Sequence, residues 1–257
     1  MQQDRHVVFC LNEIGVLGGV TSAVESLAGL LEEHGWKVSF LGITSRRRGP
    51  DRDRRDWRPL IASPRLTTRI RGAGLANRVL RRADFALARR RLTHMPAGSV
   101  VVFTNVWVKK ELDAAGYRGK DFGHYLVGQH HGSLAGSQAS WEFDAMLDHY
   151  RDLDVFVALC EADAGDFAEH LDVPCTTLSN LVGLPALGRV PVQGRVLSVG
   201  RLDPNKDVER VVRLFERARR EVGADWHLHV FGDGPSRSSV EEMSAAWAPR
   251  AASPCTA

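Results

Sequence analysis

The strongest constraint on the fold is a short β-branched segment that ends on glycine and is followed by two cations and a helix. Arg195 to Val199 reads Arg-Val-Leu-Ser-Val, a composition typical of a buried parallel strand. Gly200 lets the chain leave this strand without a side chain in the way, and we predict that a helix begins near Asp207. The turn between them therefore lies at the carboxyl end of a parallel strand, the edge where α/β sheets bind ligands.

Arg201 and Lys206 place two positive charges in this turn. A guanidinium forks across phosphate oxygens, an ammonium acts as a point charge, and a helix N-terminus adds free amides and a positive dipole end. The combination favours a diphosphate over a single carboxylate. The alternative is that both side chains only solvate a loop.

A second strand and glycine turn follow, at Trp226 to Phe231 and Gly232-Asp233-Gly234-Pro235. The string Val199-Gly200-Arg201-Leu202-Asp203-Pro204-Asn205-Lys206-Asp207, with this second turn about 25 residues on, resembles the donor-binding half of retaining, nucleotide-sugar-dependent glycosyltransferases of family four. The resemblance implies an α/β chain with the GT-B fold, which has two Rossmann-like parallel-sheet domains. Residues 1–185 would form the N-terminal, acceptor-side domain, and residues 186–257 an incomplete C-terminal domain that binds the nucleotide sugar.

The resemblance also implies an activity, the transfer of a hexose from a nucleotide diphosphate sugar to a hydroxyl acceptor with retention at the anomeric carbon. The donor would be a UDP-sugar or a GDP-sugar, with no cofactor and no obligatory metal. The acceptor would be a cell-surface glycan, a glycolipid or a natural product. Gly200, Arg201 and Lys206 would bind the donor diphosphate, and the loop of Gly232, Asp233 and Gly234 would lie on the nucleotide side.

The first predicted strand, Arg5 to Leu11, ends in a glycine-rich turn that leads into a helix. The turn does not have the G-x-G-x-x-G spacing, and no acidic residue ends the next strand, so a nicotinamide site is disfavoured. In the resembling family this loop faces the interdomain cleft, where Gly18 and Gly19 would let a ligand approach the backbone. The alternative is a tight turn without a ligand.

The predicted strand Phe122 to Gln129 ends in His130, His131 and Gly132. Adjacent histidines point to opposite sides of an extended chain, so the pair cannot chelate one metal from one face. In the resembling family a histidine at this strand end projects into the cleft beside the donor sugar. We assign this catalytic position to His131, which leaves the strand just before Gly132, although a histidine on a loop is more often a structural hydrogen-bonding group.

The positive charge of the chain is concentrated in one segment. Between Arg46 and Arg91 lie sixteen arginines and four aspartates, a net charge of +12 in a chain whose formal net charge is +3. We predict a mobile loop over 46–74 and a basic amphipathic helix over 75–92, which would suit an anionic membrane surface. A solvated arginine-rich surface is the alternative, whereas nucleic acid is disfavoured because only Trp57 and Phe85 could stack on bases.

The sequence shows no secretory signal and no membrane-spanning run, and its four cysteines lack metal or redox spacing. We expect a cytoplasmic chain, peripheral at the inner membrane face if the basic segment binds lipid.

The resemblance implies a longer C-terminal domain with an E-x-F-G loop and a second glutamate, and neither is present here. We therefore expect a truncated or frameshifted product with impaired activity and with exposed apolar residues at Leu197, Val199, Leu228 and Val230. Two alternatives stay open: a non-catalytic binding module for an anionic membrane or partner, and a sugar-nucleotide epimerase of the same fold. The sequence does not specify the sugar, nucleotide base, acceptor, pathway or oligomeric state.

Overall fold

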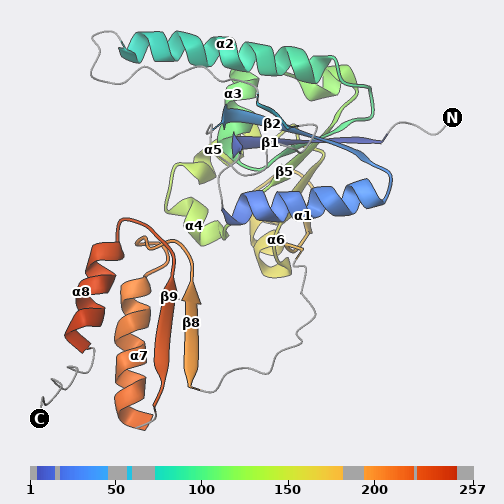
Figure 1. The fold of residues 1–257 in the computed structure, drawn as a ribbon. Helices are drawn as coiled ribbons and strands as arrows, with labels where there is room; N and C mark the ends of the chain where they lie inside the picture. The colour runs from blue at the N-terminus through green and yellow to red at the C-terminus, as the bar shows by residue number, and fades with distance from the viewer. Residues whose placement is uncertain are drawn as a thin grey trace, which may run out of the picture. The chain divides into compact units, whose positions relative to one another are not determined.

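The computed structural model describes residues 5–14, 18–45, 57–59, 73–181, 194–222 and 225–247 (Figure 1). The chain divides into two compact units, Met1–Gly183 (unit 1) and Leu184–Ala257 (unit 2). Each unit contains one parallel sheet with helices packed against it. The α/β class expected from the sequence is confirmed in both units.

Unit 1 is built on a seven-stranded parallel sheet with the strand order β3-β2-β1-β4-β5-β6-β7. The strands are β1 (His6–Ile14), β2 (Lys37–Ser45), β3 (Trp57–Pro59), β4 (Val100–Phe103), β5 (Tyr125–Gln129), β6 (Val155–Ala158) and β7 (Cys175–Thr177). The helices are α1 (Gly19–Glu33), α2 (Ala73–Thr93), α3 (Val106–Ala114), η1 (Gly119–Phe122), α4 (Leu134–Gln138), α5 (Glu142–His149) and α6 (Glu161–Ala168).

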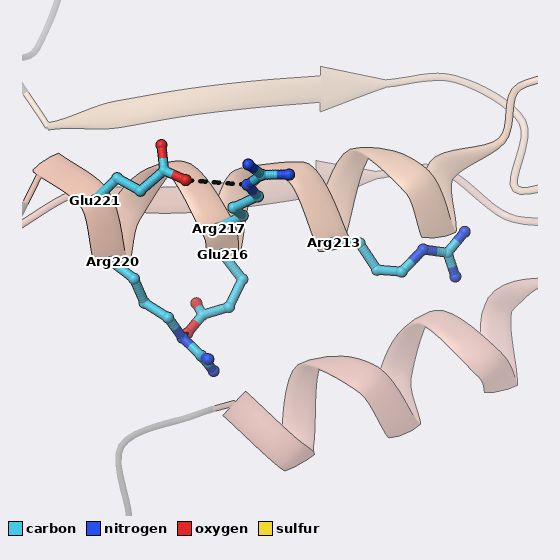
Figure 2. Close-up of a pocket in the computed structure, with 5 residues that line it drawn as sticks. All are labelled: Arg213, Glu216, Arg217, Arg220 and Glu221. Carbon is cyan, nitrogen blue, oxygen red and sulfur yellow. Dashed lines mark hydrogen bonds and ion pairs between the residues drawn. The ribbon is translucent and has the colours of Figure 1, made fainter.

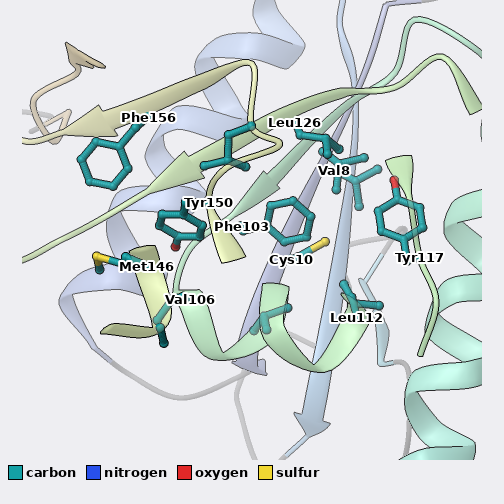
Figure 3. Packing of buried hydrophobic residues seen from close by; sticks show 14 of the residues in the cluster. Val8, Cys10, Phe103, Val106, Leu112, Tyr117, Leu126, Met146, Tyr150 and Phe156 are labelled. Carbon is teal, nitrogen blue, oxygen red and sulfur yellow. The ribbon is translucent and has the colours of Figure 1, made fainter. Parts of the chain in front are cut away.

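Both faces of the unit 1 sheet are buried, and β1 shows how the sequence achieves this. Val8 and Cys10 belong to the larger core cluster, with side chains from α2, α3, α5 and α6 (Figure 3). Val7 and Phe9 belong to a second cluster, with Val24 of α1. Because side chains alternate along a strand, the continuous apolar run supplies both clusters at once.

The structure differs from the sequence-based expectations in three places. The predicted loop over 46–74 contains the short strand β3, and its remaining residues before Ala73 lie outside the described residues. The start of the predicted strand at Phe122 is instead the end of the 3₁₀ turn η1. The short helices α4 and α5 were not predicted. Among the helices of the described ranges, none is both long enough and apolar enough to cross a membrane.

Unit 2 consists of β8 (Arg195–Val199), α7 (Val208–Val222), β9 (His227–Phe231) and α8 (Arg237–Trp247). The two strands pair in parallel, with Val196 opposite Leu228 and Ser198 opposite Val230. The core of the unit is a small cluster that joins the β8–α7 turn to both helices: Leu202, Val208, Val212 and Val240, with Leu228, Val230 and Met243 partly buried against them. The expectation that Leu228 and Val230 are exposed was therefore wrong, because the helices cover that face.

The other face of the unit 2 sheet carries exposed apolar side chains. Leu197 is 64% exposed, Val199 is 77% exposed, and Phe231 is 55% exposed. Val199 and Phe231 are direct cross-strand neighbours, so the exposed face is continuous across the two strands. Burial of each side chain would add roughly 1.5–3 kcal/mol to the free energy of unfolding. The described part of unit 2 leaves these side chains exposed and obtains little of this stabilisation.

We predict that amide hydrogen exchange in the full chain is much slower in β1 (Val7 to Leu11) and β4 (Val101 to Phe103) than in Val196 to Val199 of β8. The first two strands are central in a sheet buried on both faces, whereas β8 is half-covered in a two-stranded sheet. Exchange measured by mass spectrometry at neutral pH tests this expectation. Equal protection of the three strands would contradict it.

Candidate functional site

The carboxyl edge of the unit 1 sheet begins at the turn from β1 to α1, where the sequence places Gly18 and Gly19. Gly18 precedes the helix in an extended conformation with φ −171°, and no side chain caps the helix start. A Cβ atom added to either glycine would meet no atom of the described residues within 4 Å, and the first turn of α1 contains no acidic residue. The fold therefore does not demand glycine here, which leaves room for a ligand at the positive end of α1.

The two adjacent histidines at the end of β5 differ in their hydrogen-bond partners. His130 is buried, its Nε2 lies 2.9 Å from Ser137 Oγ, and its ring packs edge-on against Phe167. A Cβ atom on Gly132 would approach His130 Nε2 to 2.9 Å, so glycine is needed for the ring to lie there. Burial lowers the pKa of His130 to about 4. His130 is therefore a structural residue.

His131 differs from His130 in its hydrogen bonding. Both of its ring nitrogens are buried, and neither has a hydrogen-bond partner in the described part of the chain. Burial lowers the pKa of His131, so the imidazole is neutral at physiological pH. A neutral imidazole offers one donor and one acceptor to a ligand. The two histidines therefore differ in their contacts, and the assignment of the catalytic position to His131 stays a prediction.

Gln129 is a candidate site residue that sequence reasoning missed. It is the last residue of β5, its side chain is buried, and Oε1 has no hydrogen-bond partner among the described residues. The signal that could have found it is an amide side chain at the last position of an apolar strand. Tyr150 Oη is also unpartnered, but that ring lies in the core against Phe156.

In unit 2 the turn after β8 is organised by Asp203, whose side chain is only 8% exposed. One carboxylate oxygen, Oδ2, lies 2.7 Å from Arg201 Nη2, and the other, Oδ1, accepts a hydrogen bond from the Lys206 backbone amide at 3.2 Å. From the sequence, Arg201 and Lys206 were expected to place two positive charges in this turn. The structure shows that Arg201 is paired within the turn, although its guanidinium stays largely exposed.

Lys206 is the cation that remains available. Its side chain is exposed, and no carboxylate of the described ranges lies within 4.0 Å of its ammonium. Asp207 follows with a left-handed φ of 44° and accepts a hydrogen bond from the Arg210 amide at 3.3 Å, which caps α7. Gly200 is open, since a Cβ atom there would meet nothing within 4 Å. The turn thus presents Lys206 and one side of Arg201 near the start of α7.

The glycines of the turn after β9 have a different explanation. A Cβ atom on Gly232 would overlap the carbonyl oxygen of Gly200, and one on Gly234 would overlap that of Leu202. Backbone hydrogen bonds join the same segments, from Gly200 N to Phe231 O and from Leu202 N to Asp233 O, both at 3.0 Å. These glycines are required for two turns to pack backbone against backbone, so they are not by themselves evidence for a ligand.

Asp233 is exposed, and its carboxylate lies 3.6 Å from Arg237 Nη1. Its predicted place on the nucleotide side stays untested. The described residues contain no group of three or more histidine, cysteine, aspartate or glutamate side chains that could hold a metal ion.

A shallow hollow of about 360 Å³ lies along α7, but its charges are satisfied (Figure 2). Arg217 pairs with Glu221 at 2.9 Å, and Arg220 pairs with Glu216 at 3.1 Å. The Arg217–Glu221 pair is exposed and Glu216 is buried, and i, i+4 pairs of this kind are ordinary features of a helix surface. We do not assign a site to this hollow.

No family model matches the chain, and no curated protein matches it in sequence. A crystal structure of TarM superposes with a TM-score of 0.69 at 10% identity, covering 94% of this chain and 74% of that chain. A structure of a Staphylococcus aureus TarM mutant in complex with fondaparinux, alpha-GlcNAc-glycerol and UDP superposes with a TM-score of 0.51 at 17% identity, covering 63% of this chain and 34% of that chain. At these identities the likeness shows the fold, and the GT-B expectation is confirmed.

We predict that stability falls between about pH 6.5 and pH 4. Burial lowers the pKa of His130 from 6.5 to about 4, so in this window the unfolded state binds a proton that the folded state does not. Linkage then removes up to about 3 kcal/mol of unfolding free energy as the pH falls. Urea unfolding at several pH values should show that the free energy of unfolding depends less steeply on pH in His130→Gln than in the wild type. The exposed His34→Gln control should keep the wild-type dependence on pH. Parallel slopes for all three proteins would contradict this account.

We also predict that Gly232→Ala destabilises unit 2 by about 2 kcal/mol or more, because the new Cβ overlaps a backbone carbonyl that cannot move without breaking the paired turns. Gly18→Ala is the matched control, since its Cβ enters open space, and should cost less than about 1 kcal/mol. Urea unfolding of both variants checks the difference. Equal stability of the two would show that the turns can separate.

Proposed function

We propose that the chain is a retaining glycosyltransferase that moves a hexose from a UDP-sugar or a GDP-sugar to a hydroxyl acceptor. The observation that carries this proposal is the turn after β8, where the unpaired Lys206 and the Asp203-oriented Arg201 stand at the carboxyl end of a parallel strand, next to the start of α7. Fixed positive charge at a helix N-terminus suits a diphosphate. The GT-B fold of the chain supports the same assignment.

In the proposed reaction, the bond between the anomeric carbon and the β-phosphate oxygen breaks, and its electron pair leaves with the nucleoside diphosphate. A bond forms between the anomeric carbon and the acceptor oxygen, whose proton passes to the leaving diphosphate or to solvent. Arg201 and Lys206 stabilise the charge that develops on the diphosphate, which is the main electrostatic contribution of the protein. The proposal includes no obligatory metal.

His131 is the proposed contact with the donor sugar. Its imidazole is neutral and has two unpartnered nitrogens, so it can donate one hydrogen bond and accept another. Sugar hydroxyl groups are themselves both donors and acceptors, which matches this pair. Gly18 and Gly19 would leave space for a ligand at the start of α1, and Gly232, Asp233 and Gly234 would lie on the nucleotide side.

The TarM mutant structure supports the choice of donor and acceptor class. That structure contains UDP together with alpha-GlcNAc-glycerol, an α-linked sugar on a hydroxyl compound. An α-linked product formed from an α-linked nucleotide sugar is the outcome that retention gives. The acceptor of this chain would be a hydroxyl group of a cell-surface glycan, a glycolipid or a natural product.

We predict that Lys206→Ala weakens the binding of UDP or GDP by at least about tenfold, because it removes the one unpaired cation of the turn after β8. Isothermal titration calorimetry with each nucleotide measures the change. Arg217→Ala is the control, since it removes an equal charge from the exposed surface of α7 and should leave the affinity within about twofold.

Unchanged nucleotide affinity in Lys206→Ala would overturn the assignment of the diphosphate site. Nucleotide binding without sugar transfer would favour the alternative of a non-catalytic binding module. Conversion of the nucleotide sugar in the absence of any acceptor would identify the third candidate, a sugar-nucleotide epimerase.

A further inference from the structure

A cavity of about 480 Å³ lies in unit 1 at the edge of the sheet opposite to His131. His6 and Lys37 line it, and they are paired neighbours at the starts of β1 and β2. Leu87 and Arg90, near the end of α2, line its other side. Because all strands of this sheet are parallel, the cavity is at the amino edge, and the carboxyl edge with Gly18 and His131 is not part of it.

The lining of the cavity combines positive charge with an apolar surface. Lys37, Arg90 and Arg91 contribute three cations, and none of the twelve lining residues that the structure describes is acidic. Half of the lining is apolar, including Phe40, Leu87 and other aliphatic side chains from β1, β2 and α2. A volume of about 480 Å³ is within the range of ordinary small-molecule sites.

A purely structural role explains only part of this arrangement. Cations in the last turn of a helix interact favourably with its negative dipole end, which accounts for Arg90 and Arg91 on α2. It does not account for Lys37, which comes from β2 and faces the same cavity, nor for the lack of a carboxylate among the described lining residues. Charge complementarity therefore favours an anionic group at the cavity.

We propose that this cavity binds an anionic amphiphile, with a phosphate or carboxylate at Lys37 and Arg90 and its hydrocarbon chain against Leu87 and the apolar wall. The apolar lining distinguishes such a ligand from a free inorganic anion, and the cations distinguish it from a neutral lipid. The inference does not depend on the proposed glycosyl transfer, because the cavity shares no residue with that site.

The ligand could come from a bilayer or from solution, and α2 bears on this choice. The helix runs along one side of unit 1 (Figure 1), and it also carries Arg82 and Val79 as exposed side chains outside the cavity lining. An exposed basic helix next to the cavity is compatible with an anionic membrane surface. The same two residues supply matched controls for a test of the cavity itself.

The binding test uses decyl phosphate below its micellar concentration, with the full chain, in a calorimeter. We expect decyl phosphate to bind at least about tenfold more tightly than inorganic phosphate or decyl maltoside. Arg90→Glu and Leu87→Gln should each weaken it by at least about tenfold, whereas Arg82→Glu and Val79→Gln should stay within about twofold of the wild type. Thermal midpoints of the four variants verify that each is folded.

Three results would overturn the proposal: no binding of decyl phosphate, equal binding of inorganic phosphate, or equal losses in Arg90→Glu and Arg82→Glu. The last result would mean that binding follows net charge alone.

A second arm identifies the source of the amphiphile. Sedimentation with phosphatidylglycerol vesicles that is lost in Arg90→Glu but kept in Arg82→Glu would assign the cavity to a membrane lipid. Decyl phosphate binding without sedimentation would assign it to a free amphiphile. Both outcomes support the cavity as a site for an anionic amphiphile.

Discussion

A parallel sheet must bury both of its faces, and this requirement determines where unit 1 can carry out chemistry. Six consecutive residues of β1, His6 to Leu11, are buried, and their alternate side chains supply two separate cores. Once helices occupy both faces, only the two edges of the sheet remain open to ligands. Gly18 and His131 lie at the carboxyl edge, and the cavity with Lys37 lies at the amino edge. The positions of both candidate sites thus follow from the core.

In unit 2 the buried carboxylate of Asp203 determines which charges the turn after β8 presents. Asp203 uses both oxygens, one for the Arg201 guanidinium and one for the Lys206 amide. A buried carboxylate without partners would be costly, so the pairing stabilises the turn and orients Arg201 at the same time. The consequence for function is that the turn carries less free positive charge than its sequence suggests. In the proposed function, Lys206 is then the side chain on which diphosphate binding would depend most.

The sequence predicts the fold well where apolar runs are continuous. The β-branched run of β8 and the helix expected to begin near Asp207 predicted a βα unit, and the structure contains it at Arg195–Val199 and Val208–Val222. The strand β3 was missed because Trp57-Arg58-Pro59 is only three residues long and ends in proline. The amino-edge cavity could not be predicted, since His6, Lys37 and Arg90 come together only in the folded chain.

The candidate site was predictable in its residue types but not in their contacts. Sequence reasoning treats every glycine in a turn alike, whereas the structure separates Gly18, with open space around it, from Gly232, which packs on the Gly200 carbonyl. Arg201 and Lys206 were both expected to bind the diphosphate, and only the structure shows that the Asp203 carboxylate pairs with Arg201.

The polar atoms at the end of β5 in unit 1 differ in chemistry from the cations in the turn after β8 in unit 2. Buried polar atoms are nearly always hydrogen-bonded, and His130 follows this rule through Ser137. His131 and Gln129, which flank it in the chain, have polar atoms without a hydrogen-bond partner among the described residues. A neutral imidazole and an amide oxygen offer both donors and acceptors, which match hydroxyl groups, whereas a diphosphate has only acceptors and needs cations. In the proposed function, the carboxyl edge of unit 1 would therefore contact the sugar, and the turn with Lys206 in unit 2 would bind the diphosphate.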